Sequence, residues 1–151
     1  MWLRKGDSDE KLSGKIIWIT GRRSSGKSTL ISAIRNRMPN VIALEDHLRC
    51  RTKINGKDLN AYQQMIGLAF ALAYQGFDVL VPAGCRSREL RAMIRAEIPS
   101  SIFVYIAGRG NLCPDYEEPQ PDETIIHLDG SLSTEQELQI VMEKIWKINQ
   151  K

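Results

Sequence analysis

One short loop constrains this chain more than any other feature. The stretch GRRSSGKS, residues 21–28, fits the pattern G-x-x-x-x-G-K-[ST] without a gap. The apolar β-branched run IIWIT precedes it, and an apolar helical pattern that stops at Pro39 follows it. A strand, a glycine-rich turn and a helix in this order direct backbone N–H groups and a helix N-terminus at one point, which favours phosphate groups. The chain is therefore expected to fold around a strand–loop–helix unit that binds a nucleotide.

The side chains of this loop predict how the phosphates are held. Lys27 is expected to neutralise the β- and γ-phosphate oxygens, and the Ser28 hydroxyl is expected to ligate Mg²⁺. Arg23, inside the loop, is a candidate acceptor ligand. The residues expected to bind ATP here are Gly21, Ser24, Ser25, Gly26, Lys27, Ser28 and Thr29.

The rest of the chain alternates between strand and helix patterns. Apolar strands are expected at VIALED (41–46), DVLVPA (78–83), SIFVYIA (101–107) and TIIHL (124–128), and helices at about 60–75, 87–97 and 133–148. Ser87 and the pair Ser133 and Gln136 have the pattern of helix N-caps. Near-continuous apolar strands between helices predict an α/β fold, with a five-stranded parallel sheet covered by helices on both faces.

Length and composition are typical of one domain. A chain of 151 residues with 42% hydrophobic content can bury a single sizeable core. We expect a flexible arm over residues 1–13 and one domain over 14–151. No apolar run is long enough to cross a membrane, and the first residues lack a signal-peptide pattern, so a cytoplasmic protein is expected. The three cysteines and two histidines are too dispersed for a metal site.

The charges are strongly segregated along the chain. Residues 21–57 contain nine basic and two acidic residues, a local net charge of +7. Residues 109–143 contain one basic residue and nine acidic ones. The first half of the chain is therefore expected to face an anionic partner.

A phosphotransferase also needs a carboxylate near the metal and the acceptor hydroxyl. In a parallel sheet this group should follow the C-terminal end of a strand. The turns PAGCRS and IAGRG, after the third and fourth strands, contain no acid. Asp129 follows the fifth strand, but fifth strands usually lie at a sheet edge. Glu45 and Asp46, after the second strand, are the candidates that remain.

Several of these segments together resemble one kinase family. The chain over about 15–130 is similar to the kinases that phosphorylate adenylyl sulfate (APS), on the stretches IIWITGRRSSGKSTL, LEDHLR, GFDVLVPAGCRSRELRAMIR and YEEPQPDETIIHLDG. The resemblance implies a P-loop kinase-type three-layer fold. It also implies that Asp46 and Arg49 contact the acceptor and help to organise the metal, that Arg86 and Arg88 face the acceptor, and that Arg109 packs on the ATP base.

The chain also departs from this pattern. The family has a helical, Lys-rich lid between the fourth strand and the tyrosine–acid–x–Pro segment, where this chain has only GRGNLCPD. Lids enclose small acceptors. The expected function is therefore an ATP- and Mg²⁺-dependent kinase that phosphorylates a hydroxyl of a nucleotide-like acceptor, either adenylyl sulfate or a hydroxymethylated base in DNA. A P-loop regulatory or binding module without an acceptor is the alternative, and a homodimer is possible.

Overall fold

The computed structural model describes residues 12–21, 26–44, 59–82, 87–107 and 117–148. Their elements, in chain order, are β1 (Ile16–Gly21), α2 (Lys27–Arg37), β2 (Ile42–Ala43), α3 (Leu59–Tyr74), β3 (Val79–Pro82), α4 (Arg88–Glu97), β4 (Ile102–Ile106), β5 (Ile126–Leu128) and α5 (Thr134–Trp146). The five strands form one sheet in the order β2-β3-β1-β4-β5, and each neighbouring pair is parallel. The predicted α/β fold with a five-stranded parallel sheet is confirmed.

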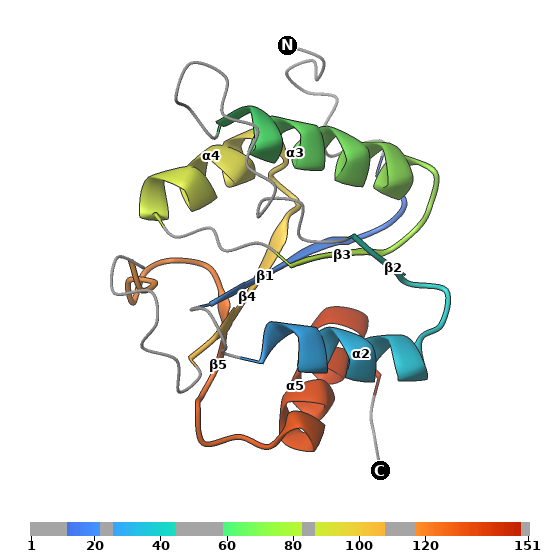
Figure 1. Cartoon of the computed structure of the whole chain (residues 1–151), viewed down its shortest axis with the longest axis vertical. Helices are drawn as coiled ribbons and strands as arrows, with labels where there is room; N and C mark the ends of the chain where they lie inside the picture. Colours follow the sequence, from blue (N-terminus) through green and yellow to red (C-terminus); the bar gives the residue numbers. More distant parts are fainter. Residues whose placement is uncertain (1–11, 22–25, 45–58, 83–86, 108–116, 149–151) are drawn as a thin grey trace.

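Helices cover the sheet on both faces (Figure 1). The helices α3 and α4 lie on one face, and α2 and α5 lie on the other. Alternate residues of β1 point to opposite faces, as the pleat of a strand requires. Ile16 and Trp18 belong to the core beneath α3 and α4, whereas Ile17 and Ile19 belong to the core beneath α2 and α5. All four are buried, which explains why the central strand has a continuous apolar sequence.

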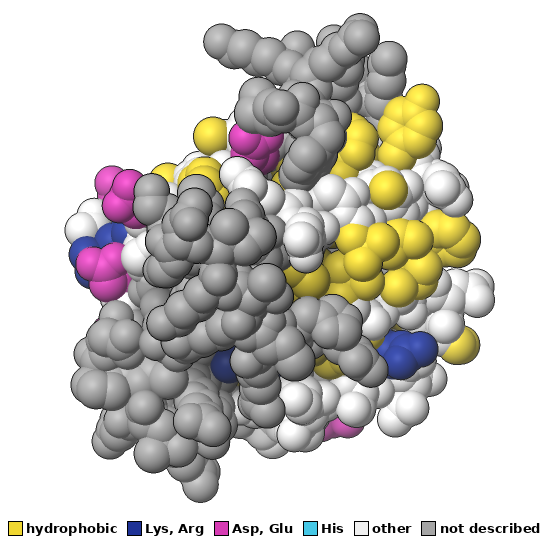
Figure 2. All heavy atoms as spheres, turned by 45° about the horizontal axis from the view of Figure 1, so that its top comes forward, with side chains coloured by type: hydrophobic (Ala, Val, Ile, Leu, Met, Phe, Trp, Pro, Cys, Tyr) yellow, Lys and Arg dark blue, Asp and Glu magenta, His cyan; other side chains and the backbone are white. Residues whose placement is uncertain are grey.

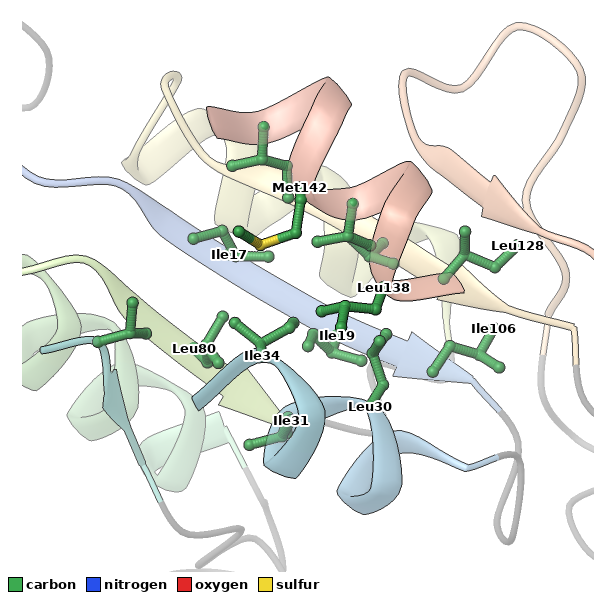
Figure 3. Close-up of a cluster of buried hydrophobic side chains, with 14 residues drawn as sticks. Ile17, Ile19, Leu30, Ile31, Ile34, Leu80, Ile106, Leu128, Leu138 and Met142 are labelled. Carbon is green, nitrogen blue, oxygen red and sulfur yellow. The ribbon is translucent and has the colours of Figure 1, made fainter. Parts of the chain in front are cut away.

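The core between the sheet, α2 and α5 is aliphatic (Figure 3). Leu30 and Ile34 from α2 meet Leu138 and Met142 from α5 over Ile17 and other strand residues. This packing fixes α2, whose first turn follows the glycine-rich loop, against the sheet. The orientation of the loop's helix is thus set by buried apolar area, which stabilises a fold by about 25 cal/mol per Å².

The four strands expected after the glycine-rich loop are all shorter in the structure, and the difference is largest for β2 and β5. β2 is only Ile42–Ala43, although the Leu44 N–H still donates to the Leu80 carbonyl at 2.9 Å. β5 spans Ile126–Leu128, not 124–128. Both are edge strands with one neighbour each, so fewer ladder hydrogen bonds hold their ends.

The helix boundaries agree closely with the predicted ones. Ser87 caps α4, its side chain accepting from the Leu90 N–H, and Ser133 with Gln136 forms a capping box on α5. α5 ends at Trp146, before the predicted end at 148, because Lys147 adopts a left-handed conformation with φ of 56°.

One part of the outer surface of α3 is apolar. This helix contains no charged residue, and Leu68 and Tyr74 are 47% and 51% exposed. Figure 2 shows apolar side chains gathered on part of the face that α3 helps to form. None of the helices in the described part of the chain is long and apolar enough to cross a membrane.

Candidate active site

The start of α2, directly after the glycine-rich loop, has a backbone conformation that favours glycine. Gly26 occupies the N-cap position of α2 with φ of 104° and ψ of 16°, a left-handed conformation that side chains disfavour. A Cβ built on Gly26 would meet no atom within 4 Å, so the requirement for glycine is conformational and not steric. No side chain caps the helix from this position, which leaves the N-terminal N–H groups of α2 available to an anion.

Lys27 is the first residue of α2, and its side chain reaches back to the end of β1. Its ammonium group donates to the Gly21 carbonyl at 3.0 Å, and the side chain is half-buried. The ammonium therefore lies between the end of β1 and the start of α2, where a lysine meets the phosphates of a bound nucleotide. Ser28 and Thr29 follow in the first turn of the helix and are exposed.

The register of the central strands places this loop among the other strand ends. Gly21 pairs with Ile106 of β4, and Ile106 pairs with Leu128 of β5. Because neighbouring strands lie about 4.8 Å apart, the turn after β5 is only about 10 Å from the end of β1. These ends form the edge where α/β sheets bind ligands, and we call it the catalytic edge.

Asp129 follows β5 at this edge and is exposed. Its carboxylate accepts a hydrogen bond from the Ser131 N–H at 3.0 Å, which holds the pKa of Asp129 below its ordinary value. β5 is confirmed as an outermost strand of the sheet, but β2 is the outermost strand on the other side. Asp129, Glu45 and Asp46 therefore all follow outermost strands, so this criterion does not favour one candidate over another.

Several predicted site residues lie outside the described residues: Arg23, Ser24, Ser25, Glu45, Asp46, Arg49, Arg86 and Arg109. The structure brings together Gly21, Gly26 and Lys27, with Ser28 and Thr29 in the helix that they begin. Arg88 lies on the other side of the sheet, at the first position of α4.

Arg88 binds a segment that is distant in sequence, the residues 117–124 that we call the acidic strap. Its Nε donates to the Glu118 carbonyl at 2.9 Å, and its backbone N–H donates to the Glu117 carboxylate at 2.9 Å. A carboxylate at this place is also favoured by the dipole of α4. The start of the acidic strap is thus fixed to the N-terminus of α4, which follows β3 at the catalytic edge.

Two further arginines of α4 hold the rest of the acidic strap. Arg91, which is fully buried, donates to the Glu123 carboxylate at 2.7 Å and to the Glu117 carbonyl at 2.8 Å. Arg95 donates to the same carboxylate at 3.1 Å and to the Thr124 carbonyl at 3.0 Å. Burial alone would raise the pKa of Glu123, but the hydrogen bonds from Arg91 and Arg95 outweigh it and lower the pKa.

The acidic strap also contacts the sheet. The Tyr105 hydroxyl donates to the Glu118 carboxylate at 3.4 Å, and Tyr105 pairs with Thr20, the residue before Gly21 in β1. The Arg95 guanidinium lies 4.3 Å from the centre of the Phe103 ring. Two acidic residues, Glu117 and Glu118, thereby reach the catalytic edge.

The sequence did not predict Glu117 and Glu118 as site residues, because only acids that directly follow strands were considered as candidates. A usable signal was present in the arginine spacing of α4. Positions 88, 91 and 95 fall on one side of a helix, and a long acidic stretch follows later in the chain. Among the described residues, no group of three or more His, Cys, Asp or Glu side chains is placed to hold a metal ion.

Comparison with known proteins supports the fold. No family model and no curated protein sequence matches the chain. Among solved structures, the Mycobacterium tuberculosis APS kinase CysC, as its Cys556Ala mutant, is similar at 26% identity and a TM-score of 0.65, over 87% of this chain and 96% of that one. Another structure of CysC contains AMPPNP and APS.

Two other solved structures extend the comparison. A sugar kinase from Janibacter sp. matches at 16% identity and a TM-score of 0.65, over 85% of this chain and 92% of that one. A hexameric APS kinase from Thiobacillus denitrificans matches at 18% identity and a TM-score of 0.59, over 89% of this chain and 29% of that one. The chain therefore has a P-loop kinase-like fold, and its structural neighbours include APS and sugar kinases.

Proposed function

We propose that this protein is an ATP- and Mg²⁺-dependent kinase that transfers the γ-phosphoryl group to a hydroxyl of a nucleotide-like acceptor. The observation that carries the proposal is the left-handed Gly26 at the start of α2, with the Lys27 ammonium held at the Gly21 carbonyl. Backbone N–H groups at a helix N-terminus together with a lysine provide the charge stabilisation that phosphoryl transfer requires. A kinase complexed with AMPPNP among the structural neighbours supports ATP as the donor.

Each candidate site residue has a proposed role in the reaction. Lys27 neutralises charge on the β- and γ-phosphates, while Ser28 and Asp46 hold Mg²⁺, which would neutralise charge between these phosphates. Asp46, with Glu45 in reserve, orients the acceptor hydroxyl and receives its proton. Arg109 packs on the base, and Arg23, Arg49, Arg86 and Arg88 hold the acceptor.

Adenylyl sulfate is the first acceptor to test, because APS kinases are among the structural neighbours. The second is a hydroxymethylated base in DNA, favoured by the local net charge of +7 over residues 21–57 and by the short sequence in place of a lid. A DNA acceptor should bind with a steep dependence on salt, about 0.9 per phosphate contacted in a double-logarithmic plot.

The direct test is transfer of a labelled γ-phosphate to both acceptors, with Lys27→Ala as the inactive variant. We expect transfer to fall by at least about 10³-fold, because a charge that acts on the transferring group is lost. Ser28→Ala should also reduce transfer. Ser32→Ala is its matched control, since Ser32 is exposed one turn later on the same helix. Near-normal transfer by folded Lys27→Ala protein would contradict the proposal.

The same assay separates the proposed kinase from the alternative function, a regulatory or binding module that hydrolyses nucleotide slowly. In a kinase, turnover of ATP rises when an acceptor is supplied, and the label appears on the acceptor. In a regulatory module, turnover is independent of both acceptors and the label appears only as inorganic phosphate.

A homodimer is part of this proposal. The uncharged outer side of α3 exposes Leu68 and Tyr74, and Tyr74 stacks on Phe70 with ring centres 6.2 Å apart. A second copy of the chain would remove this apolar surface from water. Light scattering during size-exclusion chromatography measures the assembly, and Leu68→Lys should favour the monomer if α3 forms the contact.

A further inference from the structure

Burying the charged side chain of Arg91 in α4 costs free energy, so we ask what else this residue does. Arg91 is fully buried beside the apolar core of α3 and α4, and its partner Glu123 is largely buried. A buried ion pair often stabilises a protein no more than apolar side chains of the same size, because both charges lose their hydration. Buried charged groups can instead fix one arrangement of the chain. The arrangement that Arg91 fixes here is that of the acidic strap.

The acidic strap begins at the catalytic edge. Arg95, near the C-terminal end of α4, holds Thr124, whereas Arg88, at its N-terminal end, holds Glu117 and Glu118. The acidic strap therefore runs alongside α4, with its first residues at the N-terminal end of that helix. Its last residues lead into β5.

Glu118 is exposed, yet two hydrogen bonds from other elements hold it. The Arg88 guanidinium holds its carbonyl, and the Tyr105 hydroxyl holds one of its carboxylate oxygens, yet the residue remains exposed. Tyr105 lies in β4 beside Thr20 of β1, and Gly21 and the loop follow directly. The Glu118 carboxylate thus lies on the α4 side of the sheet, while Lys27 begins a helix on the opposite side.

We propose that Glu118 binds the acceptor, and that Arg91 is a positioning residue that holds Glu118 in place through the acidic strap. The inference rests on the proposed kinase function and specifies its acceptor side. A carboxylate accepts hydrogen bonds from hydroxyl or amino groups and repels phosphate and sulfate. Glu118 therefore selects the end of the acceptor that carries hydrogen-bond donors and disfavours its anionic end.

The experiment measures KM for the acceptor, KM for ATP and kcat in wild type and in Glu118→Gln, with adenylyl sulfate and with a duplex that carries hydroxymethylated bases. A hydrogen bond to a charged group contributes about 1.5–3 kcal/mol, so we expect KM for the acceptor to rise about 10- to 100-fold. KM for ATP should stay within twofold, and the thermal midpoint should not change. Glu89→Gln is the matched control, because it removes an exposed acid from the first turn of α4.

Two further variants test how Glu118 is held. Tyr105→Phe keeps the aromatic ring and removes only the hydroxyl, so KM for the acceptor should rise by a smaller factor, about threefold. Glu123→Gln keeps the shape of the acidic strap but weakens its contact with Arg91 and Arg95. It should raise KM for the acceptor while KM for ATP is unchanged, and a purely structural role would move neither constant.

The possible failures are distinguishable. If wild-type protein phosphorylates an acceptor and Glu118→Gln leaves KM for that acceptor within twofold, Glu118 does not bind it and this inference is wrong, while the kinase function stands. If wild-type protein transfers label to neither acceptor, the proposed function itself fails and the inference fails with it.

Discussion

The two helical layers are held to the same sheet by different forces. The buried core beneath α2 and α5 consists of Ile, Leu, Val and Met side chains. The layer of α3 and α4 adds the aromatic rings of Trp18 and Phe103, and beside them the buried guanidinium of Arg91. Apolar packing tolerates exchange between side chains of similar volume, whereas a hydrogen-bonded ion pair requires particular partners in one geometry.

This difference corresponds to different tasks. The α2 and α5 layer holds a helix that follows β1 closely in the chain, at a separation of only a few residues. The α4 layer must hold the acidic strap, which is separated from Arg91 by 26 to 32 residues and joins the sheet only afterwards, through β5. Directional hydrogen bonds fix such a segment where apolar contacts alone would allow it to slide.

The largest expected effect is the loss of stability in Arg91→Ala. Removing one partner leaves Glu123 with Arg95 alone and creates a cavity, so unfolding should become easier by about 3–5 kcal/mol. Ile34→Ala, in the aliphatic layer, should cost a comparable 2–5 kcal/mol. Urea unfolding measures both. Only Arg91→Ala should also accelerate hydrogen exchange at the Arg88 amide, which donates to Glu117.

A paired replacement sharpens this prediction. Arg91→Met combined with Glu123→Leu removes both charges together, and its stability should lie within about 2 kcal/mol of wild type, because the cost of hydration lost on folding disappears as well. If this double variant is as unstable as Arg91→Ala, the ion pair contributes directly to stability, and the view that it mainly fixes the arrangement of the acidic strap is wrong.

A smaller effect is expected from the two left-handed glycines on opposite layers. Gly26 begins α2 with φ of 104°, and Gly76 follows α3 with φ of 102°. A Cβ disfavours this conformation by about 1–2 kcal/mol, so Gly26→Ala and Gly76→Ala should lower the free energy of unfolding by similar amounts. Calorimetric titration with ATP should show weaker binding for Gly26→Ala only. Equal loss of affinity in both variants would contradict the assignment of the loop.

The smallest expected effect is a pH dependence of opposite sign in the two layers. The pKa of Glu123 is lowered, despite the opposing effect of burial, by its bonds to Arg91 and Arg95, so its contribution to stability is present at neutral pH and is lost as the pH falls through the folded-state pKa. Burial raises the pKa of Glu137, so its protonated form stabilises the fold at low pH and this contribution is lost as the pH rises.

Glutamine variants measure these contributions. Glu123→Gln should destabilise the protein at pH 7 and approach wild-type stability in acid. Glu137→Gln should be neutral or stabilising at pH 7, by less than about 1 kcal/mol. Thermal midpoints between pH 4 and pH 8 provide the check. If both substitutions change the thermal midpoint equally at every pH, neither carboxyl has the shifted pKa described here.

Local patterns explain how much of the fold could be predicted. Ser87 and Ser133 identified two helix starts because an N-cap side chain bonds only the residues that follow it. The length of β2 could not be read in the same way, since VIALED is apolar enough for a strand, and the number of paired residues depends on how far β3 runs beside it. The candidate site shows the same division. Gly26 and Lys27 were predicted from a local motif, and their binding of phosphate stays a prediction, but the contacts of Glu117 and Glu118 were not foreseen.

The sequence by itself determined the nucleotide loop, the parallel α/β architecture and the residues available to phosphate, because each depends on neighbours within a few positions. Only the tertiary structure decided which acids reach the catalytic edge. The spacing of Arg88, Arg91 and Arg95 places them on one side of a helix, but it does not say which segment they bind. They bind the acidic strap because the order of strands places β5 beside β4 and brings the chain back along α4. Contacts between segments this far apart follow from topology, which no local pattern of residues encodes.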